Sequence, residues 1–386
     1  MNGSDWECMR KYVQKNGRSM FITSMDQIEK QILLELDNAF EYQKKTSAEQ
    51  QDFNFTLRKI LFNINHVFAF GKRFEGSDED LEVFIDVLYG TSSGSAPCRL
   101  YPDWIWKLLD KHGFDEFERK QQLHHKQVLS LRDYIDKHIK TGASNYSRTQ
   151  AVETRLDLYL RAVGDDTLGS HAEETMHAFL SSSLRAGTNF TYAKLVKCIW
   201  YLQEYPDIQK KCRDIVYQVC GNNPVKWSDR AAMLYLEAFS MEVSRMNSEV
   251  VGIFAIENQQ ETSLLGYTIP KNCAIRCYMH SAHMDSKYWA EPTVFNPNRH
   301  LSDGKLKLNP AYNPFGLGPR MCIAQKEMNY VQFLVFANLL QRYTFEKEDF
   351  TGEESFESAA EMFLNRPLPF KTKVTPLTGL DQSEYH

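Results

Sequence analysis

The stretch NPFGLGPRMCIAQKEM, residues 313–328, sets one cysteine, Cys322, between a glycine-rich loop and a long apolar helical pattern. Gly316 and Gly318 permit backbone conformations and close approach that side chains forbid. Such a loop can surround a sulfur with backbone N–H groups while a flat cofactor lies against it. The positive N-terminal end of the helix predicted after Cys322 favours a thiolate, and Arg320 suits an anionic carboxylate. The alternative is that Cys322 is a small core hydrophobe, the usual role of a free cysteine.

The composition is that of a large folded protein. With 386 residues, of which 42% are hydrophobic and 13% aromatic, the chain can fill a sizeable core, as two lobes or one large helical domain. A net charge of -5 gives no support for nucleic-acid binding, which needs a basic face. Eight cysteines are too sparse for a disulfide scaffold and include no CxxC pair, which argues against a zinc site. We expect reduced thiols in a protein that faces the cytosol.

The written sequence contains no membrane anchor that we can identify. No stretch reaches the length of an apolar membrane span, and the start, MNGSDWECMRKYVQKN, lacks the apolar centre of a signal peptide.

Hydrophobic periodicity predicts a mostly helical fold with a small β component in the C-terminal half. Ser170 and Glu173 form a capping-box pattern at the start of the longest helix, and Pro206 ends it. Short β-like segments fall between residues 250 and 280, and residues 142–169 read as a weakly structured linker leading into the longest helix. The helices are predicted over residues 55–70, 77–90, 115–141, 170–203, 228–246 and 326–343.

Two further residue pairs are spaced for joint action on helices. Glu242 and Arg245 in MEVSR lie three residues apart and share a helix face, although such a pair alone is worth only about 0.2–0.5 kcal/mol. Trp6 and Arg10 in DWECMRK are separated by one helical turn, which places both on one side of a helix.

Together these motifs resemble the cytochrome P-450 superfamily, whose haem-binding loop has the pattern FxxGxRxCxG. Phe315, Gly318, Arg320 and Cys322 match it, and Ala324 stands in place of the final glycine. The resemblance is strongest to the microsomal family-two clan of animals. Further matching segments, in order, are FAFGKRFE (68–75), GYTIPKN (266–272), SAHMDSKYW (281–289) and FLVFANLLQRYTF (333–345).

The resemblance implies one catalytic domain over residues 1–386 that starts near the family's helix C. The fold would lack the N-terminal anchor, the first helices and the early β-strands, which normally close the substrate pocket and hold the enzyme to the endoplasmic reticulum membrane. We therefore expect either an N-terminally truncated product or a loss of the family's activity.

The same resemblance assigns roles around a haem, iron protoporphyrin IX. Cys322 would be the axial iron ligand, with Phe315 packed beside the sulfur, and thiolate ligation favours O–O cleavage. Trp6, Arg10 and Arg320 would hold the propionates.

A buried charge network is implied on the same side of the haem. Glu242 and Arg245 match the family's ExxR pair, and Arg299 in FNPNRHL supplies the third partner. Such a network is costly unless all members are present, so its role is structural.

The oxygen site departs from the family pattern. RAGTNFTYAK stands where the family has AGxDTT or AGxETT, so Ala186 and Thr188 fit, but Asn189 replaces the acid and Phe190 replaces the hydroxyl residue. Phenylalanine can neither hydrogen-bond nor relay a proton. Thr188 or Thr191 would have to substitute through water. The change is either a tolerated variant or a sign of altered chemistry.

A second departure follows the ExxR helix. In NSEVVGIFAIENQQET, Ile256 falls where the family often has a basic residue on a propionate. Arg10 and Arg320 would then carry the propionates largely alone.

The leading hypothesis is a haem-thiolate monooxygenase that inserts one oxygen atom from O2 into a small lipophilic substrate, with electrons from an NADPH-dependent reductase. Its full-length form would be attached to the endoplasmic reticulum membrane. The alternatives are a haem-thiolate isomerase or dehydratase that does not activate O2, and a truncated haem-binding remnant without activity.

Overall fold

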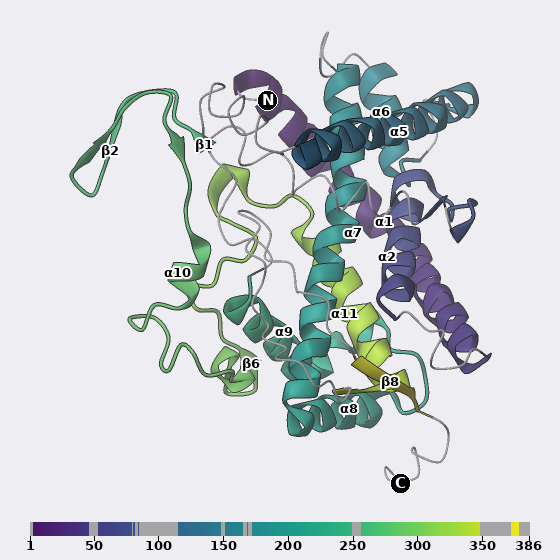
Figure 1. Cartoon of the computed structure of the whole chain (residues 1–386), viewed down its shortest axis with the longest axis vertical. Coiled ribbons are helices and arrows are strands. Elements are labelled where there is room, and N and C mark those ends of the chain that lie inside the picture. Colours follow the sequence, from purple (N-terminus) through teal and green to yellow (C-terminus); the bar gives the residue numbers. More distant parts are fainter. Residues whose placement is uncertain are drawn as a thin grey trace.

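The computed structural model describes residues 3–45, 53–78, 80–81, 84, 115–147, 151–164, 168, 172–248, 256–347 and 372–377. These residues form a mostly helical body with small two-stranded sheets on its periphery (Figure 1). The α-helices are α1 (Gly3–Lys45), α2 (Phe53–Phe70), α5 (Asp115–Asn145), α6 (Arg155–Gly164), α7 (Ala172–Glu204), α8 (Pro206–Cys220), α9 (Leu234–Met246), α10 (Met279–His283) and α11 (Gln325–Arg342).

Helix α7 is the centre of the body. It packs against α2, α6, α8, α9 and α11, and Figure 1 shows it running the length of the molecule beside α11. It ends at Glu204 because Pro206 starts the next helix, α8, where the missing N–H is no loss.

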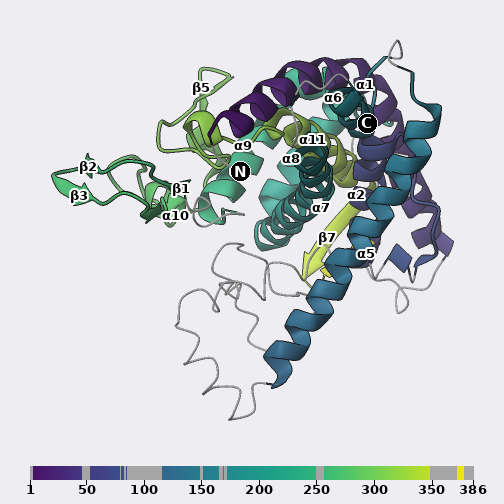
Figure 2. The same cartoon turned by 90° about the horizontal axis from the view of Figure 1, so that it is seen from above.

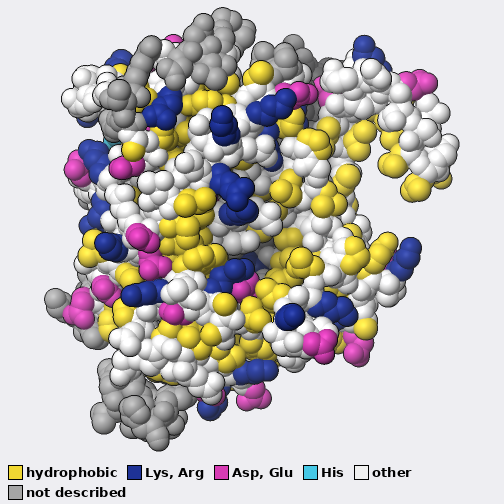
Figure 3. All heavy atoms as spheres, turned by 180° about the vertical axis from the view of Figure 1, so that it is seen from behind, with side chains coloured by type: hydrophobic (Ala, Val, Ile, Leu, Met, Phe, Trp, Pro, Cys, Tyr) yellow, Lys and Arg dark blue, Asp and Glu magenta, His cyan; other side chains and the backbone are white. Residues whose placement is uncertain are grey.

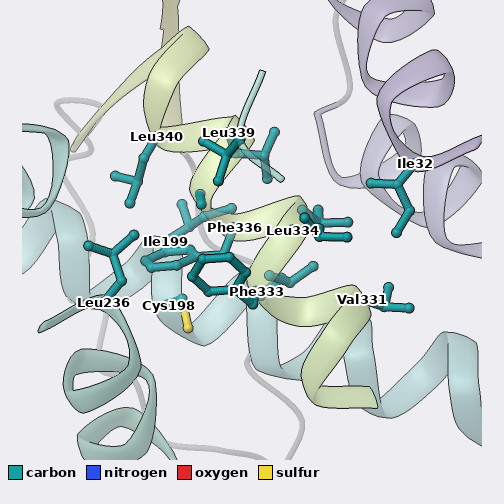
Figure 4. Close-up of a cluster of buried hydrophobic side chains, with 14 of the residues drawn as sticks. Ile32, Cys198, Ile199, Leu236, Val331, Phe333, Leu334, Phe336, Leu339 and Leu340 are labelled. Atoms are coloured by element: carbon teal, nitrogen blue, oxygen red, sulfur yellow. The ribbon is translucent and has the colours of Figure 1, made fainter. Parts of the chain in front are cut away.

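Apolar side chains of α11 fill the space between the long helices. The ring of Phe336 stacks on Phe239 of α9 with centroids 5.4 Å apart. Figure 4 shows the residues around this point, which come from α1, α7, α9 and α11: Ile32, Cys198, Ile199, Leu236, Val331, Phe333, Leu334, Leu339 and Leu340. Because α11 begins three residues after Cys322, this core fixes the helix that carries the cysteine loop.

The strands of the described residues pair as four antiparallel two-stranded sheets. The hairpin β2–β3 projects from the body (Figures 1 and 2), and its tip exposes Leu265 and Tyr267. The pairs are β1 (Ile256–Glu257) with β4 (Ala274–Ile275), β2 (Thr262–Leu264) with β3 (Tyr267–Ile269), β5 (Leu301–Ser302) with β6 (Lys305–Leu306), and β7 (Tyr343–Lys347) with β8 (Thr372–Pro376).

The predicted mostly helical fold with a small β component in the C-terminal half is confirmed. The helix predicted over 228–246 starts instead as a short 3₁₀ helix, Trp227–Ala232, before α9. Of the helix predicted over 77–90, Ser77 and Asp80 form the starting cap, with the Asp80 N–H donating to Ser77 Oγ at 3.1 Å. Most of its later residues lie outside the described ones, as does Ser170 of the predicted cap on α7.

The interpretation of 142–169 as a weakly structured linker needs correction. Helix α5 continues to Asn145, and α6 occupies Arg155–Gly164 within that range. The helix forms because Thr154 caps it: the Asp157 N–H donates to Thr154 Oγ1 at 3.1 Å, and Thr154 N–H returns a bond to Asp157 at 2.9 Å. Its Leu156 and Tyr159 are buried.

Figure 3 shows the face opposite to that of Figure 1, where hydrophobic side chains form patches and basic side chains run down the middle. Contiguous exposed apolar surface of this kind is typical of a binding face. Among the residues that the structure describes, no helix is both long and apolar enough to traverse a bilayer.

Candidate functional site

The loop before α11 bends sharply at its glycines. The Gly316 N–H closes a turn on Asn313 O at 3.1 Å, and Gly316 and Gly318 have φ values of 77° and 70°. Residues other than glycine rarely adopt this left-handed backbone conformation. The chain then folds back, so that the Cys322 N–H donates to Phe315 O at 2.9 Å. The backbone of Phe315 is thereby held to that of Cys322.

The residue Cys322 is partly buried, and opposing influences act on the pKa of its thiol. Burial raises the pKa of this thiol, while a hydrogen bond from the Ala324 N–H and the charge of Arg10 lower it, and Glu327 raises it further. The balance is a raised pKa, so the end of α11 does not by itself make a thiolate, contrary to our expectation. A bound metal cation reverses this balance because a thiol that coordinates a metal is deprotonated.

Trp6 and Arg10 of α1 reach the same loop. Arg10 Nη2 donates to Met321 O at 2.6 Å, next to the cysteine. The guanidinium of Arg320 stacks on the Trp6 ring, 3.7 Å from its centroid. Burial lowers the pKa of Arg10 and so does Arg320, while Cys322 raises it, which indicates that the three groups lie close together. The structure therefore gathers Trp6, Arg10, Arg320 and Cys322 into one cluster.

Ion pairs join the three residues of the predicted charge network, of which Glu242 and Arg245 are fully buried and Arg299 is partly exposed. Arg245 donates two hydrogen bonds of 2.8 Å to Glu242, and Arg299 Nε donates to Glu242 Oε1 at 2.9 Å. Glu242 and Arg245 have no exposed side-chain surface. The Glu242 carboxylate also accepts hydrogen bonds from the Asn296 N–H and from His300 Nε2, each at 2.9 Å. Burial by itself would raise the pKa of Glu242, but the bonds from Arg245, His300 and Asn296 outweigh it and lower the pKa to about 2.

His300 was missed by the sequence analysis. It is fully buried, with its ring against Trp289 and Tyr312. The only available signal was its place beside Arg299, and a sequence cannot show which of two neighbouring side chains turns inward. The carbonyl groups that surround Arg245, of His283, Pro292 and Val294, carry no sequence signal at all.

On α7 the proposed oxygen-site residues divide by burial. Thr188 is fully buried and its hydroxyl donates to Leu184 O at 3.0 Å, within its own helix. Thr191 is buried as well, whereas Ala186, Asn189 and Phe190 keep partial exposure. The partial exposure of Asn189 does not extend to its amide oxygen, which is buried.

Gly187 lies where α2 crosses α7. A Cβ at this position would clash with Asn65 Oδ1, and Asn65 is held by its own bond from Nδ2 to Leu61 O at 2.9 Å. The glycine therefore permits close packing of the two helices next to the oxygen-site residues.

The residues around Cys322 fit a haem. A cysteine that is not fully buried, two left-handed glycines and two guanidinium groups lie together, which provides a soft iron ligand, a close-approach loop and partners for carboxylates. Ile256, which replaces a basic residue of the family, lies in β1 with 43% of its surface exposed. It supplies no charge there.

Comparisons with known proteins agree with this arrangement. The family profile described as "Cytochrome P450" matches residues 1–374. Human cytochrome P450 2J2 is 28% identical over 355 residues, covering 89% of this chain and 68% of the relative. Mouse cytochrome P450 2U1 is 26% identical over 362 residues, covering 89% and 65%. The chain thus spans about two thirds of the length of these curated relatives.

Among solved structures, a zebrafish cytochrome P450 described as a structure with progesterone superposes with a TM-score of 0.81. The alignment covers 97% of this chain and 83% of the zebrafish chain at 21% identity, which supports the fold alone. Since the family profile covers nearly all of the sequence and the relatives belong to its second family, this chain is a member of the cytochrome P450 family.

Proposed function

We propose that the chain forms the catalytic part of a haem-thiolate monooxygenase that inserts one oxygen atom from O2 into a small lipophilic substrate. The observation that carries the proposal is the position of the Cys322 sulfur at the end of the glycine loop, with the Ala324 N–H bonded to it and Arg10 beside it. Members of the family generally perform this chemistry.

Each residue of the cluster has a task toward the cofactor. Cys322 Sγ is the iron ligand, and Trp6, Arg10 and Arg320 bind the propionates. When bound, the haem supplies O2 activation, which thiolate ligation promotes by pushing electron density onto the iron. The Ala324 N–H donates to the sulfur and holds part of its negative charge. Gly318 and Ala324 leave room for a flat group to approach the backbone.

Proton supply to the oxygen site falls to the α7 residues. Asn189 supplies an amide that can orient a water molecule once its oxygen, which is buried in the structure, is uncovered. Thr188 can take part only if its hydroxyl leaves Leu184 O, and Thr191 only if the packing around it opens. Ala186 borders the substrate. Phe190 adds an apolar wall, which suits a lipophilic substrate and slows proton transfer.

The α7 residues at the oxygen site also favour a second function. With Asn189 and Phe190 in place of an acid and a hydroxyl, the site suits an isomerase or dehydratase that acts on an already oxidised substrate, such as a hydroperoxide. Such an enzyme needs the haem thiolate but neither O2 nor a proton relay to it.

Electrons for the leading function would come from an NADPH-dependent reductase, and the enzyme would work at the endoplasmic reticulum membrane. Both proposals rest on similarity to the family-two relatives. The source of electrons is tested by adding the reductase.

The first experiment is a difference spectrum of the reduced protein with carbon monoxide. A thiolate-type Soret band is expected for the unaltered chain and for Cys277→Ala, a matched change at an exposed free cysteine. Cys322→Ala should lose the band. A band that persists in Cys322→Ala refutes the ligand assignment, and a chain that takes up no haem supports an inactive remnant.

The second experiment separates the two enzymes. NADPH consumption with reductase and product formation from O2 supports the monooxygenase. Turnover of a lipid hydroperoxide without reductase or NADPH supports the isomerase or dehydratase.

A further inference from the structure

His283 lies between the buried charge network and the cysteine loop. It is the last residue of α10 and has no exposed surface. Its backbone oxygen accepts a bond from Arg245 Nη1 at 2.9 Å. The backbone of His283 is therefore tied to the ion pair with Glu242, and its ring extends from that fixed point.

The contacts of the ring determine its tautomer. The Asn313 N–H lies 3.2 Å from His283 Nε2, and since a backbone N–H can only donate, Nε2 carries no proton. Nδ1 is then protonated and donates to Ser248 Oγ at 2.8 Å. Ser248 in turn donates to Ser244 O at 3.0 Å, at the end of α9. Each donor therefore has an acceptor in the series of hydrogen bonds from the Asn313 N–H through His283 and Ser248 to Ser244 O.

Asn313 is the base of the cysteine loop. Its carbonyl oxygen accepts the Gly316 N–H at 3.1 Å, and the turn it closes sets Phe315, whose oxygen accepts the Cys322 N–H at 2.9 Å. The ring of Tyr312, the preceding residue, stacks on the His283 ring with centroids 5.7 Å apart. The chain entering the loop is thus held by His283 at two neighbouring residues.

We infer that His283 is a positioning residue for the sulfur ligand: its ring Nε2 fixes the Asn313 N–H, and with it the start of the loop, against the Glu242–Arg245 network. The alternative is that the ring only fills space in the core. The inference rests on the proposed function for its effect on haem ligation, but the hydrogen bond itself is testable without haem.

Two substitutions test the hydrogen bonds of the two ring nitrogens separately. His283→Gln has an amide that reaches the position of Nε2 and can accept from Asn313, whereas His283→Asn reaches only the position of Nδ1 and serves Ser248. His280→Gln, on the same short helix and only partly buried, is the matched control.

The first measurement is amide hydrogen exchange of the Asn313 N–H in the haem-free protein. We expect about fivefold faster exchange in His283→Asn, the factor that loss of one ordinary hydrogen bond implies, and near-normal exchange in His283→Gln and His280→Gln. Equal exchange in all of them overturns the inference.

The second measurement is the share of thiolate-type band in the reduced carbon monoxide spectrum. It should fall in His283→Asn and be retained in His283→Gln, while a space-filling role predicts the same loss in both. If the unaltered chain shows no such band, the proposed function fails, and the exchange result still decides the inference.

A third measurement needs no variant and covers the case in which the substitutions fail to fold. Nitrogen-15 chemical shifts of the unaltered protein report which ring nitrogen of His283 carries the proton. Protonated Nδ1 with bare Nε2 is expected, and the opposite tautomer overturns the inference.

Discussion

Replacing Glu242 by glutamine tests the buried charge network with the least change of shape. The carboxylate accepts bonds from Arg245, Arg299, His300 and the Asn296 N–H, and it has no exposed surface. A glutamine side chain has one oxygen and one NH2 group. The NH2 group would replace one carboxylate oxygen and would face hydrogen-bond donors from which it cannot accept. Arg245 would also remain buried with its charge only partly compensated.

The magnitude follows from the pKa. A shift from the ordinary 4.5 to about 2 corresponds to about 3 kcal/mol of stability from this one carboxylate. Removal of one partner of a buried ion pair costs about 3–5 kcal/mol, which agrees. We therefore expect Glu242→Gln to lose about 3 kcal/mol of unfolding free energy at neutral pH.

The pH dependence has a definite sign. Because the pKa of Glu242 is lower in the folded protein, its contribution is complete above pH 4.5 and is lost as the pH falls towards 2. The stability difference between the unaltered protein and Glu242→Gln should therefore shrink across that window. Urea unfolding followed by circular dichroism at several pH values measures it.

Glu237→Gln on the same helix is the control. Burial raises the pKa of Glu237, although its partner Arg230 lowers it, and the net direction is a raised pKa, so the fold does not favour the ionised form of this carboxyl group as it does that of Glu242. This substitution should cost far less than Glu242→Gln. If Glu242→Gln costs under about 1 kcal/mol at neutral pH, or no more than the control, the network does not brace the fold as we argue.

Three further outcomes are expected. Gly187→Ala should destabilise the protein by about 1–3 kcal/mol, since its Cβ would meet Asn65 Oδ1, and Asn65→Ser should restore part of the loss in thermal unfolding; no rescue would contradict the contact. Arg10→Gln should weaken haem binding several-fold in a titration of the haem-free protein, whereas unchanged affinity would remove Arg10 from the propionate site. Phe190→Thr should raise the fraction of NADPH electrons recovered in product, and unchanged coupling would count against a missing hydroxyl as the cause.

The sequence predicted the local features well because they rest on short-range physics. Helical periodicity placed α7 to within two residues at its start and one at its end. The prediction for 142–169 failed because a stretch with few strong apolar runs hid a cap at Thr154 and Asp157 and a short helix whose Leu156 and Tyr159 face the core. A cap is a local signal, and attention to TRLD would have found α6.

The site was predictable only where a motif fixes it. The spacing of Glu242 and Arg245 predicted their pairing, and Arg299 followed from the resemblance. The roles of His300 and His283 depend on side-chain direction and on backbone carbonyls distant in sequence, which no spacing reveals. The raised pKa of Cys322 likewise needed the structure, because it depends on how far burial outweighs the nearby N–H and Arg10.

The residues of the site differ in whether the stability of the fold or the proposed chemistry requires them. Glu242 and Arg245 are required by the fold itself, because losing either leaves a buried charge. Their presence therefore says little about activity. Cys322 is different: its side chain is partly exposed and lies outside the buried hydrophobic core, so alanine there would cost the fold little. A cysteine at the end of a glycine loop, beside Arg10, is explained under our proposal by a ligand that needs sulfur. By the same reasoning we propose that Phe190, which is not fully buried, bears with Asn189 on the choice between oxygenation and hydroperoxide turnover.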